Sequence, residues 1–229
     1  MSLIPEFEVG LWNAWIFMLL VLLTFPFFIR FANKRVIPSQ EEEFKNFSKV
    51  NKTLFCSSKY IIFIAALYSI FLPLKLGTIW FYVGIPIALL GLAGLIIVMA
   101  NWANSPPKGP IKKGFYRYSR HPMYVTYFLV FLGISIATAS WLFMLFLLLF
   151  TVGTVVFVDF EEKGCLEQYG NAYYEYRDRT PRWFGIPKSK VNKNLWHLFM
   201  LRNCILFLIT FYTPFQYHYL CKSYETRPD

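Results

Sequence analysis

The hydrophobic residues of this chain gather into long blocks, and polar, basic segments separate one block from the next. Several blocks approach or exceed the roughly 18 residues that a helix needs to cross the hydrocarbon core of a bilayer. We therefore expect an all-α fold, a polytopic transmembrane helical bundle of about five core helices with a further C-terminal hydrophobic helix. The blocks cover residues 12–29, 60–74, 79–102, 124–139, 141–160 and 195–212.

The composition agrees with a membrane protein. Of the 229 residues, 56% are hydrophobic and 21% aromatic, and only 16% are charged, against about 25% in a typical soluble domain. The residues before Trp12 include Glu6 and Glu8 but no Lys or Arg. We therefore expect the first block to remain as a helix rather than to be removed as a signal peptide.

The hydrophobic blocks and the polar clusters between them suggest one membrane domain over residues 1–229. Residues 1–113 would supply the N-terminal helices and loops, and residues 188–229 the C-terminal hydrophobic helix and tail. Residues 114–187 hold the densest mixture of Arg, His, Tyr and Glu, so we predict the cofactor-binding catalytic region there.

The formal net charge of +10 raises the question of a nucleic-acid partner. Most of the 23 Lys and Arg residues lie in three segments, 30–59, 108–120 and 163–193, which alternate with segments that carry few basic residues. This is the positive-inside pattern, and it predicts that the three segments are cytoplasmic and that the N-terminus lies outside. The host would be a cell inner membrane or the endoplasmic reticulum. No nucleic acid is needed to explain the charge.

The blocks 124–139 and 141–160 are joined by almost no connection, which predicts a tight helical hairpin. The segment 114–124 precedes this hairpin and the segment 159–162 ends it. Because a hairpin returns the chain to the side from which it started, both polar segments should meet at one membrane face. We expect a functional site where they meet, facing the cytoplasm.

The residue types in these two segments suit a zwitterionic nucleoside cofactor such as S-adenosylmethionine. Arg120 can hold a carboxylate or phosphate, and His121 can donate a hydrogen bond or move a proton near neutral pH. Glu161 and Glu162 can accept from ribose hydroxyls or from an ammonium group. Aromatic faces favour a sulfonium cation. The candidate aromatic walls are Tyr116, Tyr118, Tyr124 and Tyr169.

Further candidates lie in the flanking blocks. Gly91 and Gly94 give the block 79–102 a face of small residues, which lets another helix or a flat ligand approach the backbone closely. A helix predicted over residues 161–179 places Tyr173 on a tyrosine-rich face behind the carboxylates. With three histidines in the chain, a His-rich metal site is not expected.

A linked set of motifs runs through the second half of the chain: Arg120-His121-Pro122-Met123-Tyr124, Glu161-Glu162, Tyr169-Gly170, Tyr173, Tyr176 and Pro181-Arg182-Trp183. These motifs resemble those of the isoprenylcysteine carboxyl methyltransferase and phospholipid methyltransferase superfamily. The similarity covers roughly residues 91–187 and implies an integral-membrane enzyme that binds S-adenosylmethionine at the cytoplasmic ends of its last core helices. In that family the His and Tyr of the first motif and the paired Glu line the cofactor pocket.

We therefore predict a methyltransferase that moves the methyl group of S-adenosylmethionine to a lipophilic or amphipathic acceptor. The acceptor is a prenylcysteine-like carboxylate, a phospholipid amine, or a small thiol or amine. The catalytic candidates are Glu162 or Tyr173, as a base for an amine, and Arg182, to orient an anionic acceptor.

Two other functions stay open at this point. One is a membrane reductase of the sterol type, which has a similar R-H-P-x-Y element but uses NADPH. The paired Glu161-Glu162 favours the methyltransferase over the reductase. The other is a non-catalytic membrane scaffold. The sequence names neither the acceptor nor the oligomeric state.

Overall fold

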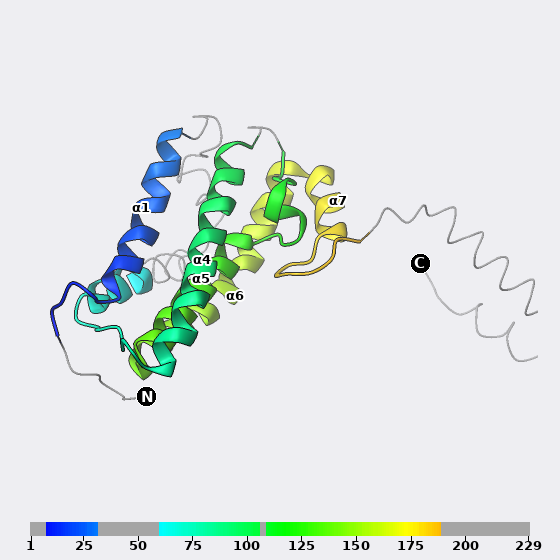
Figure 1. The fold of residues 1–229 in the computed structure, drawn as a ribbon. Helices are drawn as coiled ribbons and strands as arrows, with labels where there is room; N and C mark the ends of the chain where they lie inside the picture. The colour runs from blue at the N-terminus through cyan, green and yellow to red at the C-terminus, as the bar shows by residue number, and fades with distance from the viewer. Residues whose placement is uncertain (1–7, 32–59, 106–108, 189–229) are drawn as a thin grey trace, which may run out of the picture. The chain divides into compact units, whose positions relative to one another are not determined.

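The computed structural model describes residues 8–31, 60–105 and 109–188, and all regular elements in these ranges are helices (Figure 1). The all-α prediction is confirmed for this part of the chain. All of these residues up to Pro187 lie in one compact unit. The predicted helix at 195–212 lies outside the described residues. The helices are α1 (Trp15–Phe31), Tyr60–Ser69, α4 (Ile79–Ala103), η1 (Gly114–Arg117), α5 (Pro122–Ala137), α6 (Trp141–Tyr169) and α7 (Asn171–Arg179).

Two of these helices, α4 with 25 residues and α6 with 29, are long and apolar enough to cross a membrane. Many of their large apolar side chains are exposed at the surface of the protein, and less than half of each span is buried within it. A helix in the core of a soluble protein would bury them. The exposed apolar faces of α4 and α6 therefore suit contact with lipid.

The helices α4 and α5 pack antiparallel at very close range. A Cβ atom on Gly84 of α4 would collide with the backbone of Ala137 and would lie 2.5 Å from the carbonyl oxygen of Gly133. A Cβ atom on Gly133 would in turn collide with the backbone of Ala88. These glycines therefore let the two backbones touch, which aligns the start of α5 with the end of α4.

The predicted hairpin is present as α5 and α6, joined by residues 138–140 (Figure 1). Ser140 caps α6 by accepting a hydrogen bond from the amide of Phe143. An aromatic core holds the two helices together, since the ring of Phe131 lies 5.5 Å from the rings of both Phe143 and Phe150. The end of α6 is thereby returned to the start of α5.

The boundaries of α6 and α7 differ from the prediction. We expected one helix to end at Phe160 and another to cover residues 161–179, but α6 continues to Tyr169. Residues 159–162 include no glycine or proline, so nothing interrupts the helical hydrogen bonds there. The break comes at Gly170, whose φ of 53° is a conformation that favours glycine.

Candidate cofactor site

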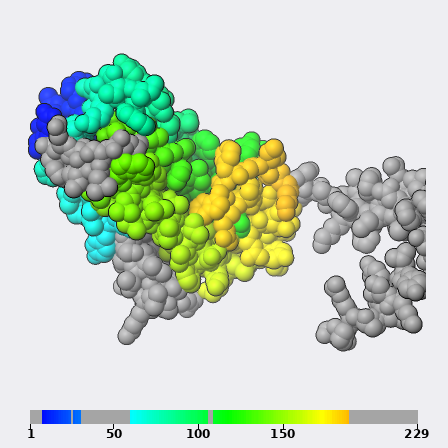
Figure 2. Space-filling model, turned by 90° about the horizontal axis from the view of Figure 1, so that it is seen from below, coloured from blue at the N-terminus to red at the C-terminus, as the bar shows by residue number. Residues whose placement is uncertain are grey.

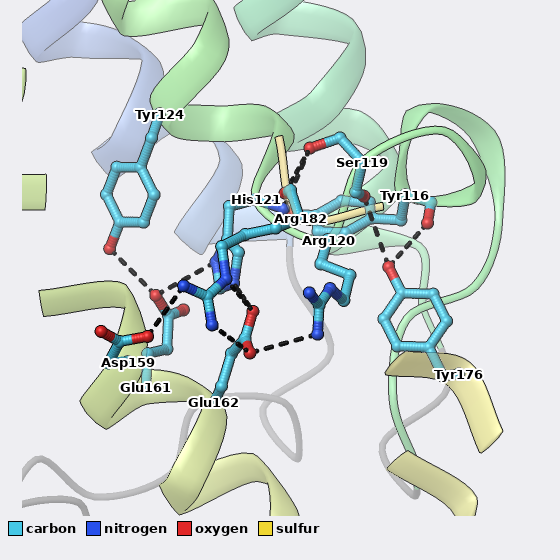
Figure 3. Close-up of polar contacts among 10 residues, drawn as sticks. All are labelled: Tyr116, Ser119, Arg120, His121, Tyr124, Asp159, Glu161, Glu162, Tyr176 and Arg182. Carbon is cyan, nitrogen blue, oxygen red and sulfur yellow. Dashed lines mark hydrogen bonds and ion pairs between the residues drawn. The ribbon is translucent and has the colours of Figure 1, made fainter. Parts of the chain in front are cut away.

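The carboxylate of Glu162, on α6, lies at the centre of a buried ionic cluster (Figure 3). It accepts hydrogen bonds from Nη1 of Arg120 at 3.1 Å and from Nε2 of His121 at 3.1 Å. It also accepts a bidentate pair from Arg182, with Nε and Nη2 at 3.2 and 3.0 Å. The predicted meeting of the Arg-His segment with the paired glutamates is therefore a feature of the structure.

His121 is buried and lies immediately before α5, which begins at Pro122. Its two ring nitrogens face two carboxylates, with Nδ1 3.4 Å from Glu161 and Nε2 3.1 Å from Glu162. Burial by itself would lower the pKa of His121, but the hydrogen bonds to Glu161 and Glu162 outweigh burial and raise the pKa above its ordinary value. The imidazolium form satisfies both contacts because both of its nitrogens donate.

This raised pKa gives a prediction for stability against pH. The stabilisation from a group whose folded pKa is raised is complete below its unfolded pKa of about 6.5, and is lost as the pH rises through the folded pKa. We therefore expect the thermal midpoint of the detergent-solubilised protein to fall as the pH rises from below about 6.5. A His121→Gln variant should lose this pH-dependent part, which differential scanning fluorimetry can measure. An unchanged slope in the variant would contradict the assignment.

Glu161 is the more accessible member of the carboxylate pair. Its side chain is 39% exposed, and its Oε2 accepts a hydrogen bond from the hydroxyl of Tyr124 at 3.2 Å. The Tyr124 ring stacks near that of His121, with centroids 6.0 Å apart. Asp159, two residues before Glu161 on α6, is also exposed and accepts from Nη1 of Arg182 at 2.8 Å. The cluster thus combines one buried carboxylate, Glu162, whose oxygens already accept several hydrogen bonds, with the accessible carboxylates of Glu161 and Asp159.

The segment after α7, residues 181–187, crosses the cluster, and we call it the strap. Its backbone pairs with the loop before α5. Pro181 accepts a hydrogen bond from the amide of Arg120 at 3.0 Å, and the amide of Gly185 donates to Tyr118 at 3.0 Å. The hydroxyl of Ser119 donates to the carbonyl of Arg182 at 3.3 Å. These bonds hold the Arg182 side chain over the ends of α5 and α6.

The tyrosines of α7 support the loop from the other side. Tyr173 and Tyr176 are buried, with ring centroids 6.0 Å apart. The Tyr176 hydroxyl donates to the carbonyl of Tyr116 at 2.6 Å (Figure 3). Burial raises the pKa of both Tyr116 and Tyr173, so each phenol is a weaker acid than that of an exposed tyrosine. Tyr176 therefore positions the segment that carries Arg120 and His121.

The two glycines predicted to contact a cofactor lie against α5 instead. A Cβ atom on Gly91 would lie 2.6 Å from the amide nitrogen of Val130, and one on Gly94 would lie 2.9 Å from Cγ2 of Thr126. The close approach that these residues permit is made by a helix. Of the two uses of a small-residue face that the sequence left open, the structure shows helix packing.

Several residues around the cluster were not among the site residues predicted from the sequence. Ser119, Asp159 and Tyr176 make the contacts described above, and the ring of Trp183 in the strap lies 6.3 Å from that of His121. Asp159 lies within the segment expected to end the hairpin, so its position was a usable signal. Trp183 was named only as part of the motif that carries the resemblance, and Ser119 gave no signal, because the contacts of both residues depend on the path of the strap.

Two buried donors have no acceptor among the described residues. They are Nε of Arg120 and the side-chain nitrogen of Asn101, near the end of α4. The Asn101 amide occupies the place that a Cβ atom on Gly114 would need, so Gly114, with a φ of 59°, cannot carry a side chain there. A buried N–H without a partner is costly, and a ligand that brings acceptors would remove this cost.

The segment that contains most of this cluster is similar to a known protein family. Residues 76–172 match the family model described as phospholipid methyltransferase. This segment is similar to the proteins of that family. The match contains Arg120, His121, Glu161 and Glu162, and it ends before the strap. The resemblance predicted from the sequence is thereby confirmed over the phospholipid methyltransferase segment.

A curated relative also carries a methyltransferase name. The chain is 39% identical over 67 residues to a methanethiol S-methyltransferase of Crocosphaera subtropica. The aligned part covers 29% of this chain and 26% of that protein, so the similarity spans only a fraction of the relative's length. Both matches are to proteins that carry methyltransferase names.

Proposed function

We propose that this protein is an integral-membrane methyltransferase that uses S-adenosylmethionine to methylate a lipophilic or amphipathic acceptor. The observation that carries the proposal is the contact of Arg120 and His121, just before α5, with Glu161 and Glu162 of α6. A site of this kind gathers an anion grip, hydroxyl acceptors and aromatic faces in one place. The phospholipid methyltransferase match over the same residues supports it.

The residues of the cluster fit S-adenosylmethionine chemically. The Arg120 side chain is 90% buried, and its Nε has no acceptor among the described residues, so it can still donate to an anionic group such as an amino-acid carboxylate. Glu161 and Asp159 keep exposed oxygens that can accept from ribose hydroxyls or an ammonium group. The rings of Tyr124 and Trp183 flank His121 and offer faces to a cation.

When bound, S-adenosylmethionine supplies an activated methyl group on a sulfonium. The role of the protein is to align the cofactor and the acceptor, because the two reactants must be held in line at an apolar boundary. Glu162 serves this by fixing Arg120, His121 and Arg182, and its oxygens are already engaged by these three cationic groups. A role for Glu162 as a base for an amine acceptor would require one of these partners to leave.

The membrane arrangement belongs to the same proposal. We take the exposed apolar faces of α4 and α6 as lipid contacts within a polytopic bundle. The site would face the cytoplasm and the N-terminus the outside, because the basic residues gather in alternate segments. Residues 114–187 would form the catalytic region of a single membrane domain. The membrane would be the cell inner membrane or the endoplasmic reticulum.

The experiment that tests the activity is methyl transfer by the full chain in phospholipid nanodiscs. Radiolabelled S-adenosylmethionine is supplied with an acceptor panel of a small thiol, a phosphatidylethanolamine and a prenylcysteine. The thiol comes first because of the name of the Crocosphaera relative. We expect label in one acceptor and none with an Arg120→Ala variant. If the wild-type protein transferred label to no acceptor and also failed to retain the cofactor, the proposal would be wrong.

A further inference from the structure

The backbone of the strap, residues 181–187, is held in place, and its side chains point in two directions, some toward the ionic cluster and some outward. Its backbone is held to the loop before α5 by the hydrogen bonds of Pro181, Arg182 and Gly185 described above. Arg182 and Trp183 face the cluster, where they contact Glu162 and the His121 ring. The outward side chains are therefore presented in a defined position and do not belong to a loose loop.

The outward side chains are large and apolar. Phe184 is 70% exposed and Ile186 is 90% exposed. Figure 2 shows the strap, in orange, at the molecular surface beside α7. Exposing two such side chains to water is unfavourable in proportion to their apolar area. A backbone held in this way keeps them outside, so the arrangement favours an apolar partner.

The depth of the strap along α6 indicates which partner this is. The exposed apolar residues of α6 continue through Val152, Val155 and Val156. Asp159, less than a turn later, pairs with Arg182 of the strap at 2.8 Å. If α6 crosses the bilayer as proposed above, the strap lies where hydrocarbon gives way to headgroups.

The charges near the strap agree with this depth. Lys188 follows it and is exposed, and Arg179, at the end of α7, is about as exposed as Glu161. Basic side chains beside exposed aromatic and aliphatic ones are typical of segments that lie in the interface of a membrane with anionic lipids.

We propose that Phe184 and Ile186 insert into the headgroup–acyl boundary of the bilayer and anchor the strap there. The partner is the lipid surface. One short segment then contacts lipid with one set of side chains and the ionic cluster with the other. The inference rests on the proposed membrane function, since it assumes that α6 spans the bilayer.

The test measures the depth of the strap in the full chain. The four native cysteines, Cys56, Cys165, Cys204 and Cys221, are replaced by serine, and an environment-sensitive fluorophore is attached at Ile186→Cys. The protein is placed in phosphatidylcholine nanodiscs that contain phosphatidylglycerol. Quenching is recorded with a lipid that carries a spin label near the head of its acyl chain, and separately with aqueous iodide. The matched control is Asp178→Cys, an exposed polar position on α7.

We expect lipid-borne quenching at position 186 to exceed that at position 178 by about twofold or more, with iodide quenching reduced to match. Equal iodide access at the two positions would overturn the proposal by placing the strap in water. Protection from both quenchers would also overturn it, because another part of the chain or a second copy would then cover the strap. If Ile186→Cys lowers the yield of folded protein, Phe184→Cys gives the same readout.

The measurement needs no cofactor. A water-exposed label on a protein that still binds S-adenosylhomocysteine would refute the strap proposal alone. A lipid-quenched label on a protein that binds no S-adenosylhomocysteine would refute the proposed function and leave the strap in the membrane. The two proposals can therefore fail separately.

Discussion

Replacing Glu162 with glutamine is expected to destabilise the protein and to remove cofactor binding together. The substitution keeps the shape of the side chain, but it leaves the nearly buried Arg120 without its counter-charge and the buried His121 with only Glu161 as a charged partner. Breaking a buried ion pair from one side costs about 3–5 kcal/mol, and we expect the lower end because Arg182 is partly exposed to solvent. Thermal unfolding in detergent and titration with S-adenosylhomocysteine measure the two effects, and the affinity should fall roughly a hundredfold or more.

The control for this prediction is Glu175→Gln. Glu175 is exposed on α7 and lies 4.0 Å from Arg179 in a surface pair of the kind that contributes little. The Glu175→Gln variant should keep a thermal midpoint and an affinity for S-adenosylhomocysteine close to those of the wild type. If Glu162→Gln behaved like Glu175→Gln in both assays, the ionic cluster would not be the element that organises the site.

Replacing Gly84 with valine should separate α4 from α5. Its Cβ atom would meet the backbone of Ala137 and the carbonyl oxygen of Gly133, and backbone atoms cannot rotate away as a flexible side chain can. Overpacking of a core costs typically 1–3 kcal/mol, and we expect about 3 kcal/mol or more here because two helices must part. The thermal midpoint of the detergent-solubilised protein measures this.

Gly164 on α6 provides the matched control, because a Cβ atom there would meet none of the residues that the structure describes within 4 Å. Alanine in a helix interior is favoured over glycine by about 0.5–1 kcal/mol. Gly164→Ala should therefore raise the midpoint slightly. A Gly84→Val protein as stable as the wild type would show that the close α4–α5 contact is not needed.

The hydrophobic pattern predicted where the helices lie better than where they end. The block 79–102 corresponds to α4, which ends at Ala103, and the block 124–139 to α5, which begins at Pro122. The block 60–74 was too long, because the helix ends at Ser69 and Pro73 pairs with Asn13 instead. Hydropathy continues through such a turn, whereas the helical hydrogen bonds do not.

The meeting of the charged segments followed from one local feature, the short connection at residues 138–140. The rest of the site depends on tertiary contacts that no local pattern records. Arg182 reaches Glu162 only because the strap pairs with the loop 118–120. Likewise, the small faces of Gly91 and Gly94 suited either a helix or a ligand, and only the position of α5 decided between them.

The central claim is that the cluster around Glu162 binds the methyltransferase cofactor, and calorimetric titration of the purified full chain tests it most directly. S-adenosylhomocysteine and NADPH are titrated in parallel into the wild-type protein and into a His121→Ala variant. The account predicts that the wild type binds S-adenosylhomocysteine and not NADPH, and that the variant binds neither. Binding of NADPH alone would contradict it and would favour a membrane reductase.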